Sequence, residues 1–204
     1  KDFLAVAPKE DNDFLNIGIV GRLVPIKNHR LFLEAAAKVI QENSSFNLRF
    51  KVIGDGQLRG DLEEYAEKLG ISNYVDFLGW QRDLTGVYSD LDAVALTSKN
   101  EGTPVSLIEA MACARPVVAT GVGGVGDLLG SQISVSGKPG FKVTERGIIV
   151  MRPDAASFAS ALEYLIKNKG LRKDMGASGR AFVKERFSRE RLINDTEGLY
   201  KGIL

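Results

Sequence analysis

Two glutamates and two cations carry the chemistry that this sequence suggests. Seven residues separate Glu101 from Glu109, and Arg22 and Lys27 lie five positions apart near the start of the chain. The segment after Glu101 has the pattern of a helix start, and a helix N-terminus favours a phosphate because its first N–H groups are unpaired. A pyrophosphate bound there would leave Glu101 beside the group on its far phosphate and Glu109 near a ribose. Because carboxylates accept hydrogen bonds from sugar hydroxyls, the spacing suits a nucleotide sugar.

The residues from 93 to 120 must position the two acids. They read as a buried strand (93–97), a loop, a helix and a second buried strand that follows Pro116. We expect Thr103 to cap the helix and Pro104 to be its first residue, since proline lacks an N–H that would be unpaired there. Taken singly, each glutamate also fits a solvated loop or helix position, so the prediction depends on the set.

Arg22 and Lys27 belong to a loop (21–28) that follows the first predicted strand. The planar guanidinium of an arginine grips phosphate oxygens in pairs, whereas lysine acts as a point charge. Either side chain alone could equally be a solvated loop charge. We expect Asn28 to cap the next helix and His29 to be a residue of its start.

Strands and helices alternate along the whole chain. Nearly continuous apolar runs predict six strands, and their alternation with helices predicts an α/β fold, a Rossmann-like doubly wound parallel sheet of about six strands. The loops after successive strands then meet at the edge where such sheets bind ligands. The polar stretch 131–146 is expected to be an insertion or a hairpin. The predicted strands are 15–20, 48–53, 74–78, 93–97, 117–120 and 147–150, and the helices outside the segment above are 29–42, 58–69, 83–89, 155–167, 171–185 and 188–204.

The composition excludes several classes of function. The chain has 204 residues and a formal net charge of +1, so it has no strong field for nucleic acid. Its apolar runs are too short to cross a bilayer. The single cysteine, Cys113, fits a buried packing position and a reducing compartment, which predicts a cytoplasmic protein. One histidine and one cysteine cannot form an ordinary zinc site, so we expect no metal.

Three loops carry weaker signals. The run from Gly121 to Gly126 matches the dinucleotide fingerprint G-x-G-x-x-G, which gives a NAD-binding oxidoreductase as the alternative function. Only three residues separate this run from Gly130, however, where the fingerprint needs a long helix, so its glycines also fit a close approach to a bound sugar or cleft mouth. Gly54 fits a turn or part of the site. Trp80 and Arg82 could flank a nucleobase, or Trp80 could be a core residue.

The chain resembles the donor-binding half of retaining GT-B glycosyltransferases, and within them family four (group 1). The resemblance covers roughly residues 15–190, and no single element is specific without the others. It is carried by the sequences GRLVPIKN, VIGDGQLRGDLEEYAEKLG, VDFLGW, EGTPVSLIEAMACARPVVAT and GIIVMRPD.

The resemblance implies roles for the site residues. Arg22 and Lys27 would neutralise the donor pyrophosphate, Glu109 would hold the ribose, and Glu101 would hold the transferred hexose. Catalysis would rest on Glu101, Arg22 and Lys27. Some relatives have an aromatic residue and glycine where this chain has Thr103 and Pro104. Because proline has no N–H, Pro104 removes one backbone donor from the expected phosphate site of this chain. The expected donor site comprises Gly21, Arg22, Lys27, Gly54, Trp80, Arg82, Glu101, Gly102, Thr103, Val105, Ser106 and Glu109.

The implied reaction is the transfer of a hexosyl group from a nucleotide sugar, expected to be a UDP-sugar, with retention and without a bound metal or other cofactor. The acceptor would be a glycan or a lipid-linked sugar in polysaccharide biosynthesis. Members of the family have two such domains, so residues 1–14 would be a linker from a missing N-terminal acceptor-binding domain. Residues 15–187 would form the donor domain, and 188–204 a helix that crosses towards the other half, with an apolar surface left exposed. The full-length protein could lie at the periphery of a membrane, and the isolated domain would have little or no activity. A third reading is a non-catalytic interaction domain that has kept the fold.

Overall fold

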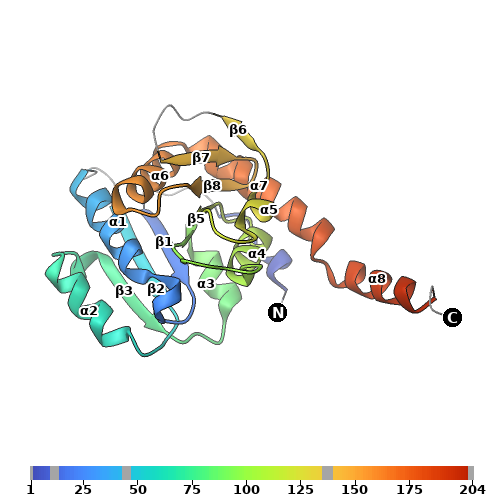
Figure 1. Cartoon of the computed structure of the whole chain (residues 1–204), viewed down its shortest axis with the longest axis horizontal. Helices are drawn as coiled ribbons and strands as arrows, with labels where there is room; N and C mark the ends of the chain where they lie inside the picture. Colours follow the sequence, from blue (N-terminus) through green and yellow to red (C-terminus); the bar gives the residue numbers. More distant parts are fainter. Residues whose placement is uncertain (1, 10–13, 43–46, 135–139, 202–204) are drawn as a thin grey trace.

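An eight-stranded sheet lies at the centre of the molecule, with helices on both of its faces (Figure 1). The structure is a computed structural model and describes residues 2–9, 14–42, 47–134 and 140–201. The strand order is β3-β2-β1-β4-β5-β8-β7-β6, and the six strands from β3 to β8 are parallel. The strands are β1 (Phe14–Val20), β2 (Asn47–Ile53), β3 (Val75–Gly79), β4 (Ala93–Leu96), β5 (Val117–Thr120), β6 (Gln132–Ser134), β7 (Phe141–Thr144) and β8 (Gly147–Val150).

The prediction of an α/β Rossmann-like sheet is confirmed, but the sheet has eight strands rather than six. The two additional strands, β6 and β7, come from the polar stretch that was expected to be an insertion or a hairpin. They pair antiparallel with each other, and β7 pairs antiparallel with β8. They escaped prediction because β6 has only three residues and neither strand is a continuous apolar run.

The helices divide between the two faces of the sheet. α1, α2 and α6 pack with one apolar core, which includes the edge-to-face pair Phe32 and Phe50. α3, α4 and α5 pack with the other, which includes Tyr88 and the buried Cys113. The observed bounds are α1 (His29–Glu42), α2 (Arg59–Lys68), α3 (Leu84–Asp90), α4 (Val105–Ala112), α5 (Val125–Leu129), α6 (Ala155–Lys167), α7 (Lys169–Arg186) and α8 (Arg189–Lys201), with short 3₁₀ turns at η1 (Phe3–Ala5), η2 (Pro25–Lys27) and η3 (Ser72–Tyr74).

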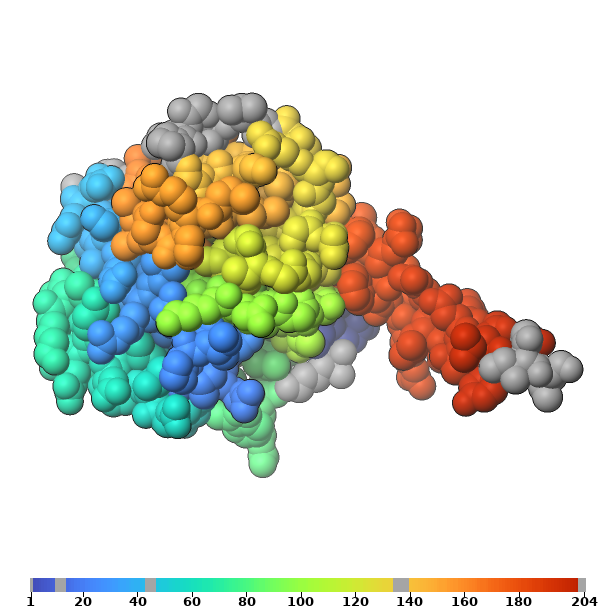
Figure 2. All heavy atoms as spheres, in the orientation of Figure 1, coloured from blue at the N-terminus to red at the C-terminus, as the bar shows by residue number. Residues whose placement is uncertain are grey.

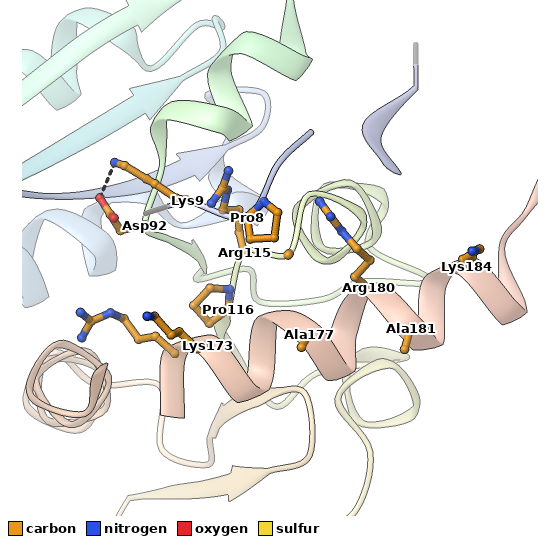
Figure 3. Close-up of a pocket in the computed structure, with 12 residues that line it drawn as sticks. Pro8, Lys9, Asp92, Arg115, Pro116, Lys173, Ala177, Arg180, Ala181 and Lys184 are labelled. Carbon is orange, nitrogen blue, oxygen red and sulfur yellow. Dashed lines mark hydrogen bonds and ion pairs between the residues drawn. The ribbon is translucent and has the colours of Figure 1, made fainter. Parts of the chain in front are cut away.

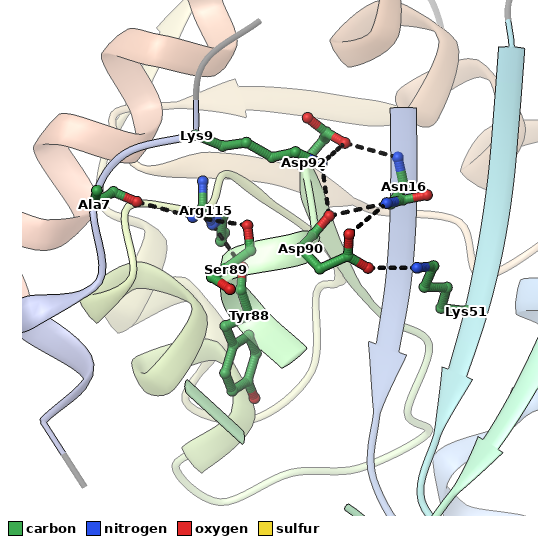
Figure 4. Close-up of polar contacts among 9 residues, drawn as sticks. All are labelled: Ala7, Lys9, Asn16, Lys51, Tyr88, Ser89, Asp90, Asp92 and Arg115. Carbon is green, nitrogen blue, oxygen red and sulfur yellow. Dashed lines mark hydrogen bonds and ion pairs between the residues drawn. The ribbon is translucent and has the colours of Figure 1, made fainter. Parts of the chain in front are cut away.

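The segment 2–9, which was expected to belong to a linker, packs against the domain. Its carbonyl oxygens accept hydrogen bonds from two arginines, Ala7 from Arg115 and Val6 from Arg180. Its Lys9 pairs with Asp92 at 2.7 Å. Figure 4 shows the contacts of Ala7 and Lys9 at the amino end of β4, where Arg115 also donates to the main chain of α3. The segment is therefore held where the chain enters the sheet.

Helix α8 projects away from the rest of the structure (Figures 1 and 2). It contains no buried residue, and its side chains Leu192, Ile193, Leu199 and Tyr200 are exposed, as predicted for part of this surface. Ile203 and Leu204, at the end of the helix predicted over 188–204, lie outside the described residues. Within the ranges described above, no helix is long and apolar enough to cross a membrane.

Candidate functional site

The loops that follow β1 and β4 meet at the carboxyl edge of the sheet. These strands are neighbours, and the chain turns to opposite sides of the sheet beyond them, so the loops flank the crevice where open α/β sheets bind ligands. Lys27 comes from the first loop and Glu101 from the second, and their Nζ and Oε1 atoms are 2.6 Å apart. The Glu101 side chain is only 10% exposed. The predicted proximity of this cation and this acid is confirmed.

Backbone contacts hold the two loops together. The Thr97 hydroxyl donates to the Lys27 carbonyl at 3.0 Å, and the Lys99 amide donates to the Ile26 carbonyl at 2.8 Å. In Figure 2 the blue surface around residue 25 lies beside the yellow-green surface around residue 100. The ion pair therefore stands on a fixed junction rather than on two independent loops.

Helix α4 begins one residue later than predicted. Thr103 is exposed and does not cap it, and Pro104 is the capping residue rather than the first helical one, with extended backbone angles and no side-chain cap. The Pro104 carbonyl accepts a hydrogen bond from the amide of Leu107 at 3.1 Å. Proline is tolerated here because its ring fixes φ and the position needs no N–H donor. Among the described groups, no acceptor is hydrogen-bonded to the amides of Gly102, Thr103, Val105 and Ser106.

Glu109 lies in the second turn of α4 and is half-buried. Its Oε2 accepts a hydrogen bond from the Tyr88 hydroxyl at 2.9 Å, and the same hydroxyl is 3.2 Å from the Ser106 carbonyl. Burial, together with the nearby Glu109 carboxylate, raises the pKa of Tyr88 well above its usual value, so the phenol remains a donor at neutral pH.

The first and second βα loops interlock through glycines. The Gly21 amide donates to Ile53 at 2.9 Å, and a Cβ on Gly54 would lie 2.0 Å from the Gly21 carbonyl oxygen. Because Gly54 also has a φ of +134°, no other residue fits easily there. Arg22 is exposed between these contacts, and its guanidinium forms no ion pair with any described residue.

Trp80 and Arg82 follow the edge strand β3, three strands from β4. At about 4.8 Å per strand, the end of β3 lies about 10 Å from the end of β1, which Lys27 follows, and about 14 Å from the end of β4, which Glu101 follows. Trp80 is 68% exposed, which excludes a core position, and the Arg82 guanidinium carbon lies 5.9 Å from the centre of its ring. The structure thus leaves this pair at the outer end of the same edge.

The glycine run after β5 approaches protein backbone. A Cβ on Gly123, whose φ is +51°, would lie 1.7 Å from the carbonyl oxygen of Glu101. The Gly124 amide donates to the Gly102 carbonyl at 3.0 Å. These glycines therefore let the loop after β5 pack against the one that carries Glu101. The helix that follows, α5, has five residues, so the dinucleotide fingerprint lacks the helix that it needs.

Sequence reasoning missed three polar side chains of this region. Ser98 is 1% exposed and donates to Glu101 Oε1 at 2.6 Å, and Tyr88 holds Glu109 as described. His29 is 2% exposed, and neither ring nitrogen has a partner among the described groups. Burial, and after it the charge of Lys27, lowers the pKa of His29 to about 4, so its ring is neutral at pH 7. Nothing in the sequence distinguishes these residues from other hydroxyls or from an exposed histidine.

A groove of about 630 Å³ lies at the opposite edge of the sheet, between α7 and the segment before β5 (Figure 3). Its walls include Asp92, Pro116 and Arg180 and none of the residues predicted for the donor. Among the residues that the structure describes, no group of three or more histidine, cysteine or acidic side chains could hold a metal ion.

Residues 15–168 match the family described as "Glycosyl transferases group 1". The chain belongs to this family. The D-inositol 3-phosphate glycosyltransferase of Corynebacterium jeikeium, a relative, is 35% identical over 167 residues, which are 78% of this chain and 37% of that protein. Nothing found supports the oxidoreductase alternative.

Two solved structures share the glycosyl transferase fold. A mutant of S. aureus TarM in complex with Fondaparinux, alpha-GlcNAc-glycerol and UDP has a TM-score of 0.81 at 24% identity, over 97% of this chain and 37% of that one. The C-terminal domain of LpcC, a group 1 glycosyl transferase from Francisella tularensis, has a TM-score of 0.72 at 24% identity, over 86% of this chain and 87% of that one. The chain spans 29% to 48% of the length of the first curated relatives that it matches.

Proposed function

We propose that this chain is the donor-binding domain of a retaining glycosyltransferase that takes its hexosyl group from a UDP-sugar. The observation that carries the proposal is the Lys27–Glu101 pair, which joins the loops after β1 and β4 just before the start of α4. This edge of the sheet brings together the cation Lys27, the acid Glu101 and, at the start of α4, amides that bond to no described acceptor. Such a set suits a ligand that carries both a diphosphate and a sugar. The UDP named in the TarM complex supports uridine as the base.

Each group has a separate task in this proposal. Lys27 has three N–H donors, so it can keep its bond to Glu101 and still contact a phosphate oxygen. Arg22 is exposed on the same loop and adds a second cation in this proposal. As the bond from the hexose to the diphosphate breaks, negative charge grows on the leaving oxygen. Arg22, Lys27 and the amides at the start of α4 stabilise that charge.

Glu101 and Glu109 read the two sugars of the donor. Glu101 lies on the loop before α4 and holds hydroxyls of the hexose, while Glu109, in the second turn of α4, holds those of the ribose. Trp80 and Arg82 offer an exposed aromatic face and a cation at the outer end of the edge, where the base would lie. In this proposal an extended nucleotide sugar lies along the carboxyl edge between these groups.

The complete enzyme has a second domain in this proposal. The chain spans less than half of the length of each of the first curated relatives, which supports an acceptor-binding domain outside it. The exposed apolar side chains of α8 suit a helix that crosses to that domain. The full protein would act on a glycan or a lipid-linked acceptor at the membrane periphery, and this chain alone would bind the donor with little or no turnover.

The direct test is the binding of UDP to this chain, measured by isothermal titration calorimetry and by the shift of its thermal unfolding midpoint. UDP is expected to bind, and Arg22→Ala or Lys27→Ala to abolish the shift. Each phosphate contact contributes about 1.5–3 kcal/mol, so losing one weakens binding at least tenfold. ADP and GDP serve as comparators for the base.

Lys68→Ala is a matched control, because it removes one positive charge from the end of α2, where the side chain is 72% exposed and pairs with Glu64. It should bind UDP like the parent chain. If millimolar UDP, GDP and ADP all fail to bind, or if Lys68→Ala loses as much affinity as Lys27→Ala, the proposal is wrong.

A further inference from the structure

Each of the two carboxylates has one oxygen held by a buried hydroxyl from elsewhere in the fold. Ser98 donates to Glu101 Oε1, and Tyr88 donates to Glu109 Oε2. Neither hydroxyl carries a charge, so it can fix the direction of a carboxylate without neutralising it. These two bonds are independent, because Ser98 follows β4 and Tyr88 belongs to α3.

Ser98 is itself held rigidly. Its carbonyl accepts the hydroxyl of Thr120 at 2.7 Å, and both residues are only 1% exposed. Together with Lys27 Nζ, the Ser98 hydroxyl supplies two donors to Glu101 Oε1, each at 2.6 Å. Two donors occupy the lone pairs of that oxygen. Among the described groups no donor contacts Oε2, so this oxygen is the one that can accept from a ligand.

Tyr88 is fixed at both ends. Figure 4 shows its main chain beside Arg115 and its ring directed away from the surrounding polar contacts. The Arg115 Nε donates to the Tyr88 carbonyl at 2.7 Å, and the ring packs edge-on against Phe3 with centroids 5.8 Å apart. The side chain is fully buried. The phenol therefore reaches Glu109 from a position that a bound ligand cannot move.

We propose that Ser98 and Tyr88 are positioning residues that separately aim the two acids of the donor site, Ser98 directing Glu101 to the hexose and Tyr88 directing Glu109 to the ribose. This inference rests on the proposed function. It predicts that the affinities for the two halves of the donor can be changed independently by substitutions at residues that touch no ligand.

The test compares the affinities of UDP, UDP-glucose, UDP-galactose and UDP-N-acetylglucosamine for this chain by calorimetry. In Ser98→Ala, UDP binds as in the parent chain, while the advantage of the preferred UDP-sugar over UDP falls by about tenfold, the equivalent of one strong hydrogen bond. In Tyr88→Phe, UDP and the UDP-sugar weaken together by about the same factor, and their ratio is unchanged. A purely structural role would not separate the two affinities in this way.

Two matched controls remove hydroxyls beside carboxylates that are not part of the proposed donor site. Tyr65→Phe deletes a tyrosine hydroxyl that donates to Glu34 at 2.7 Å, and Ser157→Ala deletes a buried hydroxyl on the residue whose amide donates to Asp154. Both should leave all four affinities unchanged. Ser98→Cys, which keeps the size but has a weak donor, should behave like Ser98→Ala, and thermal unfolding shows that each variant is folded.

The outcomes separate this inference from the proposed function. If the parent chain does not bind UDP, the proposed function fails. If UDP binds but no UDP-sugar differs from it in affinity, or if Ser98→Ala leaves the ratio unchanged, the role of Ser98 is refuted. If Tyr88→Phe alters the ratio rather than both affinities, the assignment of Glu109 to the ribose is refuted.

Discussion

The buried histidine makes the stability of this domain depend on pH in a way that one substitution can remove. His29 opens α1 two residues after Lys27, and its pKa is lowered from 6.5 to about 4 by burial and by that lysine. In the unfolded chain the ring binds a proton near pH 6.5, whereas the folded protein does not bind it until about pH 4. Between these values the unfolded state binds more protons, so stability falls as the pH falls.

The size of the effect follows from the two pKa values. A tenfold difference in proton affinity between the folded and unfolded states corresponds to about 1.4 kcal/mol, so the full difference for His29 is about 3 kcal/mol. At pH 7.5 the histidine destabilises the fold very little, whereas by pH 5 it has lowered the free energy of unfolding by about 2 kcal/mol. His29→Leu, which is close in size and does not titrate, should remove this loss. It should also be no less stable at pH 7, because it eliminates two buried ring nitrogens that have no partner among the described groups.

The assay is urea unfolding followed by tryptophan fluorescence and circular dichroism at several pH values from 5 to 7.5. The chain contains one histidine, so the difference between the parent and His29→Leu isolates its titration. Cys113→Ala is the control, since burial raises the pKa of that thiol to about 11 and its loss should lower stability equally at every pH tested. Parallel stability curves for the parent chain and His29→Leu would refute the reasoning.

Two further substitutions test the fold that supports the site. Gly123→Ala places a Cβ 1.7 Å from the Glu101 carbonyl oxygen at a positive φ, so it should lower the free energy of unfolding by more than about 1 kcal/mol and weaken UDP binding. The control is Gly126→Ala, which should be neutral because its Cβ meets nothing within 4 Å. Equal effects of the two substitutions in urea unfolding would contradict this account. Asp154→Ala removes a carboxylate that accepts the Ser157 amide at 2.8 Å and caps α6, so chemical denaturation should show a loss of about 1 kcal/mol, and a variant as stable as the parent would show that the cap contributes nothing.

Much of the fold could be predicted because it depends on local sequence. The bounds of α1 and α6 match the expected ones, and Asp154 caps α6 as its type and position indicated. The six parallel strands were visible as apolar runs between helices. β6 and β7 were not, because the pairing of β7 with β8 and of β6 with β7, rather than their own composition, makes them strands.

The site divides in the same way. Lys27 and Glu101 could be predicted to lie at one edge, because each follows a strand of a parallel sheet. The structure brings the two side chains into contact. The hydroxyls that hold the acids could not be found, because Ser98 and Tyr88 become significant only once tertiary packing buries them. The offset at Pro104 has a local cause that propensity does not resolve, since proline fits both the cap and the first helical position.

Helix α8 has an energetic consequence for the chain. A helix of thirteen residues with no buried side chain lacks the tertiary packing that supplies most helical stability in proteins, and on its own such a helix is marginal in water. Unfolding of α8 would therefore cost little and leave both cores intact. The surface that receives the apolar side chains of α8 must supply the free energy that orders this helix. In the chain by itself, the amide hydrogens of α8 should therefore exchange with solvent far sooner than those of β1 or β4.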